Sequence, residues 1–341
     1  MLSLKRIDLN PELWMELDQF EDRTIFQTLP WLNFVAKTQA AELVVASIEE
    51  DGCTLGYFTG LIVKKFGFKI LGSPFGGWTT DYMGFNLMPG ASCRRVLEIL
   101  PSFAFDDLGC QYLEIIDPHV REEDFSGFSY TVQPLQRFMV DLTKSEKDLF
   151  SSMEKKSCRW CIRKAEKSGV TIEEACDIGF ADDHYAQVMD VFAKQSLVPP
   201  YGIEQVRELI RYLYPTGHLL LLRARNSGGD CIATGIFPAF NNTAMYLLGA
   251  SWRQHQKLRP NELLMWYAMR YWKDRGVKTI DLGGGWSDYK TKYGSYESHI
   301  FRLKKAKYKL LIPMRDRALQ VWRVNQKILG LLKSIRSSYQ F

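Results

Sequence analysis

The second half of the chain reads TAMYLLGASWRQHQKLRPNELLMWYAMRYWKDRGVKTIDLGG from Thr243 to Gly284. An apolar strand at 243–251 is followed by a polar loop and then by an amphipathic pattern over 261–275. Gly276 is a typical residue for the end of a helix, and 277–284 has the composition of a further strand. The stretch therefore predicts strand, loop, helix and strand, which is an order typical of α/β proteins.

The same order of elements occurs earlier in the chain. Residues 42–73 are expected to form three strands joined by tight turns, and 90–107 a helix that ends at Gly109. The strand 110–117 follows, and its surroundings, DDLGCQYLEIID, resemble KDRGVKTIDLGG in the second half. Two strands between positions 218 and 240 precede the quoted stretch in the same way. Because the whole order matches, and not the endings alone, the sequence predicts two related units produced by duplication.

Length and composition agree with a folded protein of two domains. The chain has 341 residues, and a domain commonly has about 150. Hydrophobic residues make up 46% and charged residues 24%, a balance typical of globular rather than disordered chains. No run approaches the roughly 18 apolar residues that a membrane span needs. The acidic N-terminal segment MLSLKRIDLNPELWMELDQFEDR is unlike a secretory signal, so we expect a cytoplasmic protein.

The cysteine pattern favours neither disulfides nor a metal. The seven cysteines are scattered and odd in number, which argues against a disulfide framework. Cys158 and Cys161 form one CxxC pair within a predicted helix, without a second pair or histidines at a suitable spacing. We expect no metal site.

The net charge of +5 is concentrated at the C-terminal end. Residues 301–341 contain eleven Lys or Arg and one Asp, whereas the rest of the chain has 33 basic and 38 acidic residues. Within 314–336, an apolar stripe is expected at Val321, Trp322, Ile328, Leu329, Leu332 and Ile335. Basic residues flank it at Arg315, Arg323, Lys327, Lys333 and Arg336. Such a helix can lie on an anionic membrane surface or cap the second domain, and both alternatives stay open.

Three motifs point to a known family. Residues 159–170, RWCIRKAEKSGV, resemble the R-x-x-I-R-K-A-x-x-x-G-V opening of the second domain in the FemAB-like, GNAT-related acyltransferases. The D-L-G-G of the quoted stretch and the YKTKYG at 289–294 resemble the later motifs of that domain. PFGGWTTDYMGF at 74–85 resembles the G-P-x-x-D-Y loop of the first domain. The resemblance is clear over about 140–300 and weaker over 25–120. It extends to FemABX peptidyltransferases and to polysaccharide-associated acetyltransferases.

The resemblance implies a fold and its division into domains. The fold is an α/β (α+β) tandem GNAT fold, in which each domain is a mixed, mainly antiparallel sheet flanked by helices. The expected N-terminal domain is 1–138, the C-terminal domain with the main motifs is 139–312, and a basic helix occupies 313–341.

The resemblance also implies an acyltransferase. The expected reaction moves an acyl group from acyl-CoA to an amino or hydroxyl group of a sugar, glycan or cell-envelope precursor. An aminoacyl-tRNA-dependent, FemABX-type transfer to a peptidoglycan precursor is one alternative, and a non-catalytic accessory protein of polysaccharide biosynthesis or export is another. The acceptor class includes lipid-linked precursors, which would suit a peripheral position on the inner face of the membrane. The resemblance implies no DNA partner. It implies a tRNA partner only under the first alternative.

The donor loop departs from the pattern of simple acetyl-CoA GNATs. Their (R/Q)-x-x-G-x-(G/A) loop presents backbone N–H groups to a pyrophosphate at a helix start. The loop here, RQHQKLRPN at 253–261, contains no glycine. Phosphate contacts would therefore come from side chains and from the first N–H groups of the following helix. The residues expected at the donor are Ser251, Arg253, Lys257, Arg259 and Asn261.

Acyl transfer to an amine needs a base, donors for the oxyanion and positioning of both substrates. The family loop makes Asp81 the candidate base, although a turn-stabilising Asp is an equal alternative. Lys290 matches the family lysine and would hold a phosphate or stabilise developing charge. The alternative for Lys290 is a solvated lysine at a strand end, like Lys292 beside it. Tyr289 is a further catalytic candidate, with ordinary core packing as the alternative.

The acceptor is expected to contact four residues. Arg159 and Arg163 lie four apart on one face of a predicted helix, where they could clamp a phosphate or a carboxylate. An exposed basic helix is the alternative. Trp286, like Tyr289, would wall the acceptor pocket, with ordinary core packing as an equal alternative. Tyr82 of the family loop is the fourth substrate-binding candidate.

Overall fold

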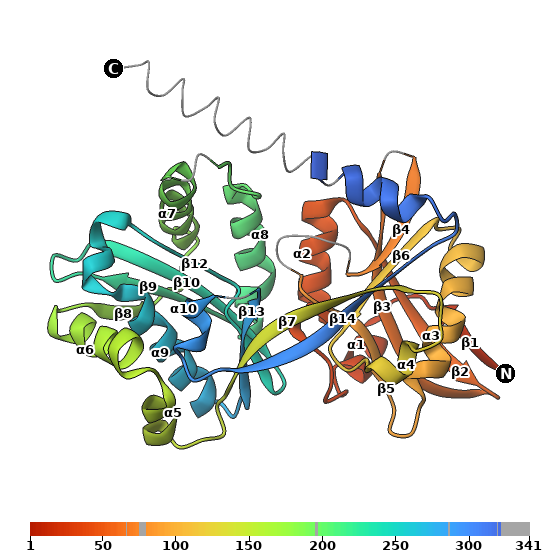
Figure 1. The fold of residues 1–341 in the computed structure, drawn as a ribbon, viewed down its shortest axis with the longest axis horizontal. Coiled ribbons are helices and arrows are strands. Elements are labelled where there is room, and N and C mark those ends of the chain that lie inside the picture. The colour runs from red at the N-terminus through yellow and green to blue at the C-terminus, as the bar shows by residue number, and fades with distance from the viewer. Residues whose placement is uncertain (66, 75–79, 195–196, 286, 319, 322–341) are drawn as a thin grey trace, which may run out of the picture. The chain divides into compact units, whose positions relative to one another are not determined.

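The computed structural model describes the chain except for residues 66, 75–79, 195–196, 286, 319 and 322–341 (Figure 1). The chain divides into two compact units. The first consists of Met1–Gln136 together with His299–Asp316, and the second contains Arg137–Ser298. No helix in the described part is both long and apolar enough to span a bilayer.

The first unit contains a sheet with helices on it. Its elements are β1 (Leu2–Arg6), α1 (Pro11–Leu17), η1 (Ile25–Gln27), α2 (Leu29–Gln39), β2 (Glu42–Glu50), β3 (Cys53–Lys65), β4 (Phe68–Ser73), β5 (Gly84–Leu87), α3 (Cys93–Ser102), η2 (Phe103–Asp107), β6 (Tyr112–Asp117), α4 (Glu122–Phe125) and the start of β7 (Thr131–Asp141). β1 to β4 pair antiparallel in chain order, and β4 pairs in parallel with β6. α3 contributes Val96, Leu97 and Leu100 to the core.

The second unit repeats this architecture with more helices. Its elements are α5 (Glu146–Ser152), η3 (Lys155–Arg159), α6 (Trp160–Lys167), β8 (Thr171–Glu174), α7 (Phe180–Lys194), α8 (Ile203–Leu213), η4 (Tyr214–Thr216), β9 (Leu219–Arg225), β10 (Cys231–Phe240), β11 (Thr243–Met245), β12 (Leu248–Ser251), η5 (Arg253–Leu258), α9 (Pro260–Asp274), β13 (Thr279–Gly284), α10 (Asp288–Thr291) and the start of β14 (Tyr296–Ala306). β8, β9 and β10 pair antiparallel, while β11 pairs in parallel with β13. α7 and α8 lie on one face of this sheet, and α6 and α9 lie on the other (Figure 1).

Strands β7 and β14 each begin in one unit and end in the other, so each unit is completed by a strand that the other unit begins. We call this the exchange of β7 and β14. β7 follows β6 in the chain, but its residues Arg137–Asp141 pair with β13 in the second unit. β14 follows β13, but its residues Phe301–Ala306 pair with β6 in the first unit. The sequence predicts residues 299–312 in the second domain, whereas the structure has them in the first unit. Pairing between strands so distant in sequence leaves no local pattern from which it could be predicted.

The expected fold class is confirmed, because each unit has a mixed, mainly antiparallel sheet flanked by helices. The parallel pairs β4–β6 and β11–β13 stand in equivalent places and agree with the predicted duplication. In the C-terminal segment, Arg315 Nη2 forms an ion pair with the buried Glu114 at 2.8 Å. Trp322 and the later residues of the predicted amphipathic helix lie outside the described residues, so that helix stays a prediction.

Candidate active site

The sheet of the second unit opens between β12 and β13. β11 pairs with β13 as far as Met245, and the Tyr246 N–H still bonds the carbonyl of Asp281 at 2.8 Å. From Leu248 to Ser251, β12 pairs with β10 on one edge. Among the described strands, none pairs with its other edge, which lies on the side of β13. An unpaired strand edge offers backbone N–H and C=O groups to a ligand.

Three tyrosines gather at this opening. The ring centroids of Tyr246 and Tyr289 are 6.2 Å apart, and those of Tyr289 and Tyr293 are 5.3 Å apart. Burial raises the pKa of Tyr246, and it raises the pKa of Tyr289 and of Tyr293 well above the usual value. A Cβ at Gly249 would lie 2.1 Å from the Tyr246 hydroxyl, so glycine is what lets this ring cross β12. The phenols therefore remain neutral hydrogen-bond donors at physiological pH.

A buried ion pair lies beside the tyrosines. Lys292 Nζ is 2.6 Å from Glu262 Oε1, and each side chain is only 9% exposed. The ammonium also lies 4.4 Å from the ring centroid of Tyr289. The interpretation of Lys292 as a solvated lysine is wrong, because it caps the one-turn helix α10 and reaches α9. Glu262 was not predicted from the sequence as a site residue. An acid directly before the apolar run LLMW could have indicated a buried carboxylate.

Lys290 contacts the glycine run that ends β13. Its Nζ donates to the carbonyls of Gly284 and Gly285, the latter at 3.2 Å. Gly283 and Gly285 have φ of +84° and +79°, a backbone conformation that favours glycine. The lysine thus closes a turn at the end of β13 and places an ammonium group there. Its catalytic role remains a prediction.

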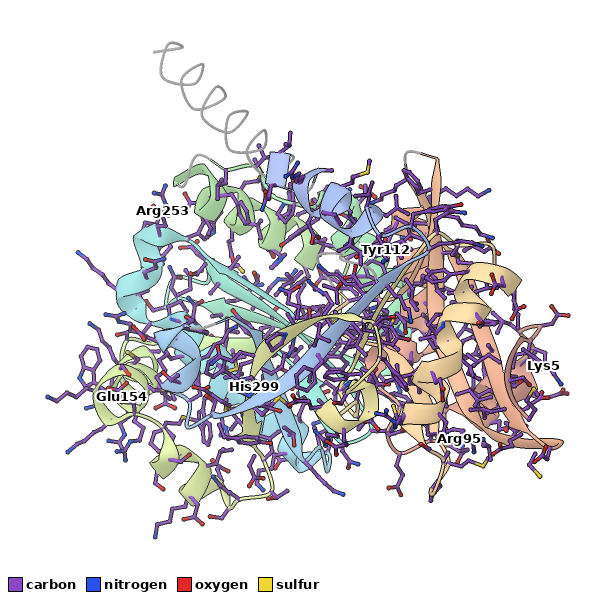
Figure 2. All side chains as sticks on the ribbon, turned by 45° about the vertical axis from the view of Figure 1, so that its right-hand side comes forward. Lys5, Arg95, Tyr112, Glu154, Arg253 and His299 are labelled. Atoms are coloured by element: carbon purple, nitrogen blue, oxygen red, sulfur yellow. The ribbon has the colours of Figure 1, made fainter. Side chains whose placement is uncertain are left out.

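The predicted donor residues fall into three groups. Asn261 Nδ2 donates to Ser251 Oγ at 3.1 Å, which joins the end of β12 to the start of α9. Lys257 and Arg259 are exposed, and neither forms an ion pair with a described residue. Arg253, on the η5 turn and labelled in Figure 2, is instead paired with Asp190 of α7, with its Nε 3.0 Å from the carboxylate. An acidic partner on a distant helix could not be predicted from the loop sequence.

The predicted acceptor residues of the second unit lie on η3 and α6. Arg159 ends a π-helical turn, and Arg163 follows on α6, where its guanidinium carbon is 5.4 Å from the ring centroid of Phe150. Arg163 is exposed and Arg159 is half-buried. Trp286 lies outside the described residues. Whether the arginines bind an acceptor stays a prediction.

Asp81 and Tyr82 belong to the first unit. Asp81 is partly buried, and the preceding residue, Thr80, accepts a hydrogen bond from Trp31 Nε1 at 3.0 Å. Tyr82 is buried, with its ring 5.1 Å from that of Phe26. This packing anchors the segment after residues 75–79, and the function of both residues stays a prediction.

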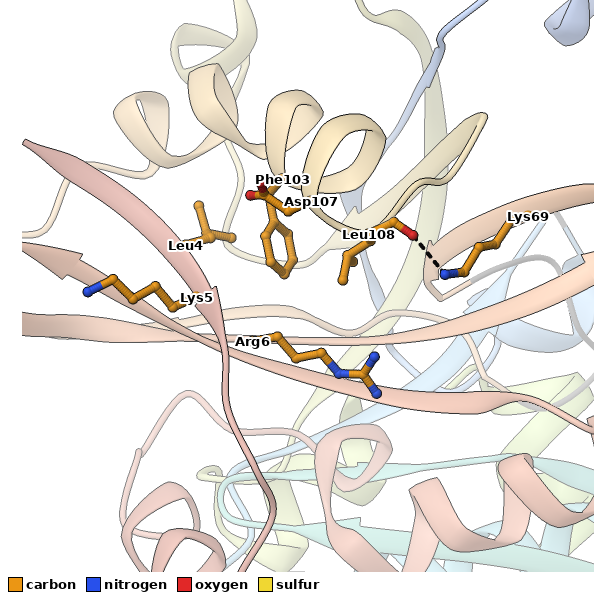
Figure 3. A pocket seen from close by; sticks show the side chains of 7 residues that line it. All are labelled: Leu4, Lys5, Arg6, Lys69, Phe103, Asp107 and Leu108. Atoms are coloured by element: carbon orange, nitrogen blue, oxygen red, sulfur yellow. Dashed lines mark hydrogen bonds between the residues drawn. The ribbon is translucent and has the colours of Figure 1, made fainter.

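A cavity of about 430 Å³ lies elsewhere in the first unit (Figure 3). It is lined by Leu4, Lys5, Arg6, Lys69, Phe103, Asp107 and Leu108. The cations at its rim are already engaged: Lys69 Nζ donates to the Leu108 carbonyl at 2.7 Å, and Lys5 and Arg6 pair with glutamates of β2 at 2.5 and 2.8 Å. The cavity contains none of the predicted site residues, and we assign it no ligand.

A buried histidine supports the sheet behind the tyrosines. His184 Nδ1 is 2.9 Å from Thr234 Oγ1 on β10, and Nε2 is 3.4 Å from the Tyr201 hydroxyl. The imidazole is fully buried, and this burial lowers its pKa from 6.5 to about 4. His184 is therefore neutral in the folded protein at pH 7.

Because the pKa of His184 is lowered, we expect the folded protein to lose stability in acid. The unfolded chain takes up a proton on His184 below about pH 6.5, whereas the folded chain resists it until about pH 4. Its contribution to the free energy of unfolding is complete above pH 6.5 and falls by up to about 3 kcal/mol as the pH drops through 4. Urea unfolding of the wild type and of His184→Asn between pH 7 and 4 measures it. The difference between the two proteins should shrink with falling pH, and a constant difference contradicts the prediction.

Comparisons with known proteins agree with this fold. Residues 152–291 match the family model described as acetyltransferase (GNAT) domain. The solved structure of FemX is similar over 87% of this chain and 96% of its own, with 14% identity and a TM-score of 0.69. L-PGS from Bacillus licheniformis is similar over 93% and 98%, with 12% identity and a TM-score of 0.57. A tandem GNAT protein from the clavulanic acid biosynthesis pathway is similar over 90% and 98%, with 11% identity and a TM-score of 0.52. No curated protein sequence matches significantly.

Proposed function

We propose that the chain is a FemAB-like acyltransferase of the GNAT superfamily with a tandem fold. From this premise, its reaction transfers an acyl group from acyl-CoA to an amino or hydroxyl group of a cell-envelope sugar or glycan precursor. The observation that carries the proposal is the opening between β12 and β13 beside the first turn of α9. This helix start has two exposed cations, Lys257 and Arg259, without ionic partners among the described residues.

The donor would bind across these two features. The N–H groups at the start of α9, together with Lys257 and Arg259, suit the pyrophosphate of CoA. The acyl carbonyl would enter the opening, where the free edge of β12 can donate hydrogen bonds to an oxyanion. The neutral phenol of Tyr246 could then protonate the departing thiolate, and Lys290 could stabilise negative charge. Asp81 remains the proposed base on sequence grounds, and Asp81→Asn tests it.

The donor site is tested by replacing its two cations. Lys257→Ala combined with Arg259→Ala should weaken CoA-thioester binding by at least about 100-fold, because each charge-assisted contact contributes about 1.5–3 kcal/mol. A thermal-shift titration with acetyl-CoA measures the change, since ligand binding raises the melting temperature of the folded protein. Lys278→Ala is the control, because this exposed lysine lies on the approach to β13. An unchanged affinity in the double variant contradicts the site.

An aminoacyl-tRNA donor is the second candidate, and the η5 turn favours it. The N–H groups of His255 and Arg259 bond the carbonyls of Trp252 and Gln256, so this loop forms no open cradle for a pyrophosphate. Retention of aminoacylated tRNA, with no response to CoA thioesters, would support this donor. Indifference to both donors would favour the non-catalytic accessory role.

A further inference from the structure

The segment Lys155–Lys167 presents an unusual outer surface. η3 and α6 bury Cys158, Cys161, Ile162 and Ala165, which face the core of the second unit and α9. Positions 156, 160, 163 and 167 follow one another at helical spacing on the opposite side, and all four side chains are exposed. This side carries two lysines and an arginine around a tryptophan. Together with Lys164, whose ammonium lies beside that tryptophan, we call it the basic face.

In the described part of the chain, the cations of the basic face have no acidic partners. None of the six basic residues of the segment forms an ion pair with a described residue: Lys155, Lys156, Arg159, Arg163, Lys164 and Lys167. Arginines elsewhere on the same unit are paired, as Arg207 is with Asp182 and Arg225 with Glu173. Two acids, Glu154 and Glu166, adjoin the six cations. The surface therefore keeps a strong positive potential that an anionic partner can neutralise.

Trp160 lies in the middle of these cations. Its side chain is 50% exposed, and Lys164 Nζ lies 5.0 Å from the ring centroid. An exposed indole surrounded by lysines is the chemistry of an interfacial membrane anchor, in which the ring enters the headgroup layer and the ammonium groups meet lipid phosphates. RNA binding would instead use an open aromatic face for base stacking, and here the Lys164 ammonium lies over the indole.

We propose that the basic face of η3 and α6 docks the protein onto an anionic membrane surface, with Trp160 inserted among the headgroups. The basic face includes no residue of the predicted helix at 314–336, and it is formed by described residues alone. Its 13 residues span about 20 Å along the helix, which is enough to contact several headgroups at once. The docking depends on charge, so it weakens as ionic strength rises.

Vesicle sedimentation of the full chain tests the proposal. The wild type should bind phosphatidylcholine vesicles that contain phosphatidylglycerol and should not bind phosphatidylcholine alone. Changing Lys156, Lys164 and Lys167 together to Glu should weaken binding to the anionic vesicles by at least about 100-fold, because each cation near such a surface contributes about fivefold. Trp160→Ala should weaken it further without a change of charge.

A matched variant controls for net charge. Lys37→Glu, Lys64→Glu and Lys278→Glu change three exposed lysines elsewhere and alter the total charge equally. This control should keep binding within a few-fold of the wild type. Equal loss in both triple variants, or undiminished binding of the basic-face variant, overturns the proposal. So does binding of the wild type to transfer RNA, lost in the basic-face variant, without binding to vesicles. The assay measures no acyl transfer, so its result is independent of the proposed function.

Discussion

Lys292→Met is expected to lower the free energy of unfolding by about 3–5 kcal/mol. The substitution keeps the length and most of the volume of the side chain but removes the ammonium that faces Glu262 at 2.6 Å. Glu262 then remains buried, and its charge loses the pairing with Lys292. Denaturant unfolding, followed by circular dichroism, measures the change.

The matched control removes both charges. Glu262→Leu combined with Lys292→Met should restore most of the lost stability, because a buried ion pair can be replaced by apolar groups of similar volume at little cost. Equal stability of the single and double variants would show that the loss comes from packing around Tyr289 and not from an uncompensated charge.

Lys290→Ala is expected to reduce kcat/KM for acyl transfer by about 100- to 1,000-fold while the protein stays folded. This magnitude is typical of removing one electrostatic contact to the transition state. The reason lies in the position of the ammonium, which is held by the carbonyls of Gly284 and Gly285 where β13 ends. Release of free CoA from an acyl-CoA, with an amino-sugar acceptor, measures the rate.

Two comparisons separate catalysis from structure. Lys290→Arg keeps the charge and should retain part of the activity, whereas Lys278→Ala should retain all of it. The melting temperature of Lys290→Ala should fall by only a few degrees, since its contacts are partly exposed. If activity per folded molecule is unchanged, Lys290 only closes the glycine turn.

The sequence predicted the regular elements well because their signals are local. The three strands expected over 42–73 are β2, β3 and β4, and the expected helix at 261–275 is α9, shifted by one residue. Thr28 precedes α2, and Pro30 lies in its first turn, where a proline is well tolerated. The strand expected over 243–251 is correct in direction but breaks at Tyr246, where it changes from pairing with β13 to pairing with β10 alone.

The candidate site was only partly predictable, because its decisive contacts join distant residues. Asp190 holds Arg253 across 63 positions, and nothing in the loop sequence indicates an acidic partner. Lys290 and Lys292 have the same local surroundings, yet the one-turn helix α10 directs them differently. Lys290 reaches the glycine carbonyls, whereas Lys292 reaches Glu262. Which of the two lysines is buried depends on the packing of α9, and this packing cannot be predicted from the local sequence motif.

The exchange of β7 and β14 has a consequence for synthesis on the ribosome. One edge of β6 is covered by β4, but its partner on the other edge, β14, ends only at Ala306. At about 5–20 residues per second, the ribosome needs roughly 10–40 s to travel from Asp117 to Ala306. During that interval β6 has an open edge, which is a template for pairing with other chains. A nascent chain stalled near residue 138 should therefore depend on chaperones, and a gene fragment that ends there would encode a unit lacking its closing strand.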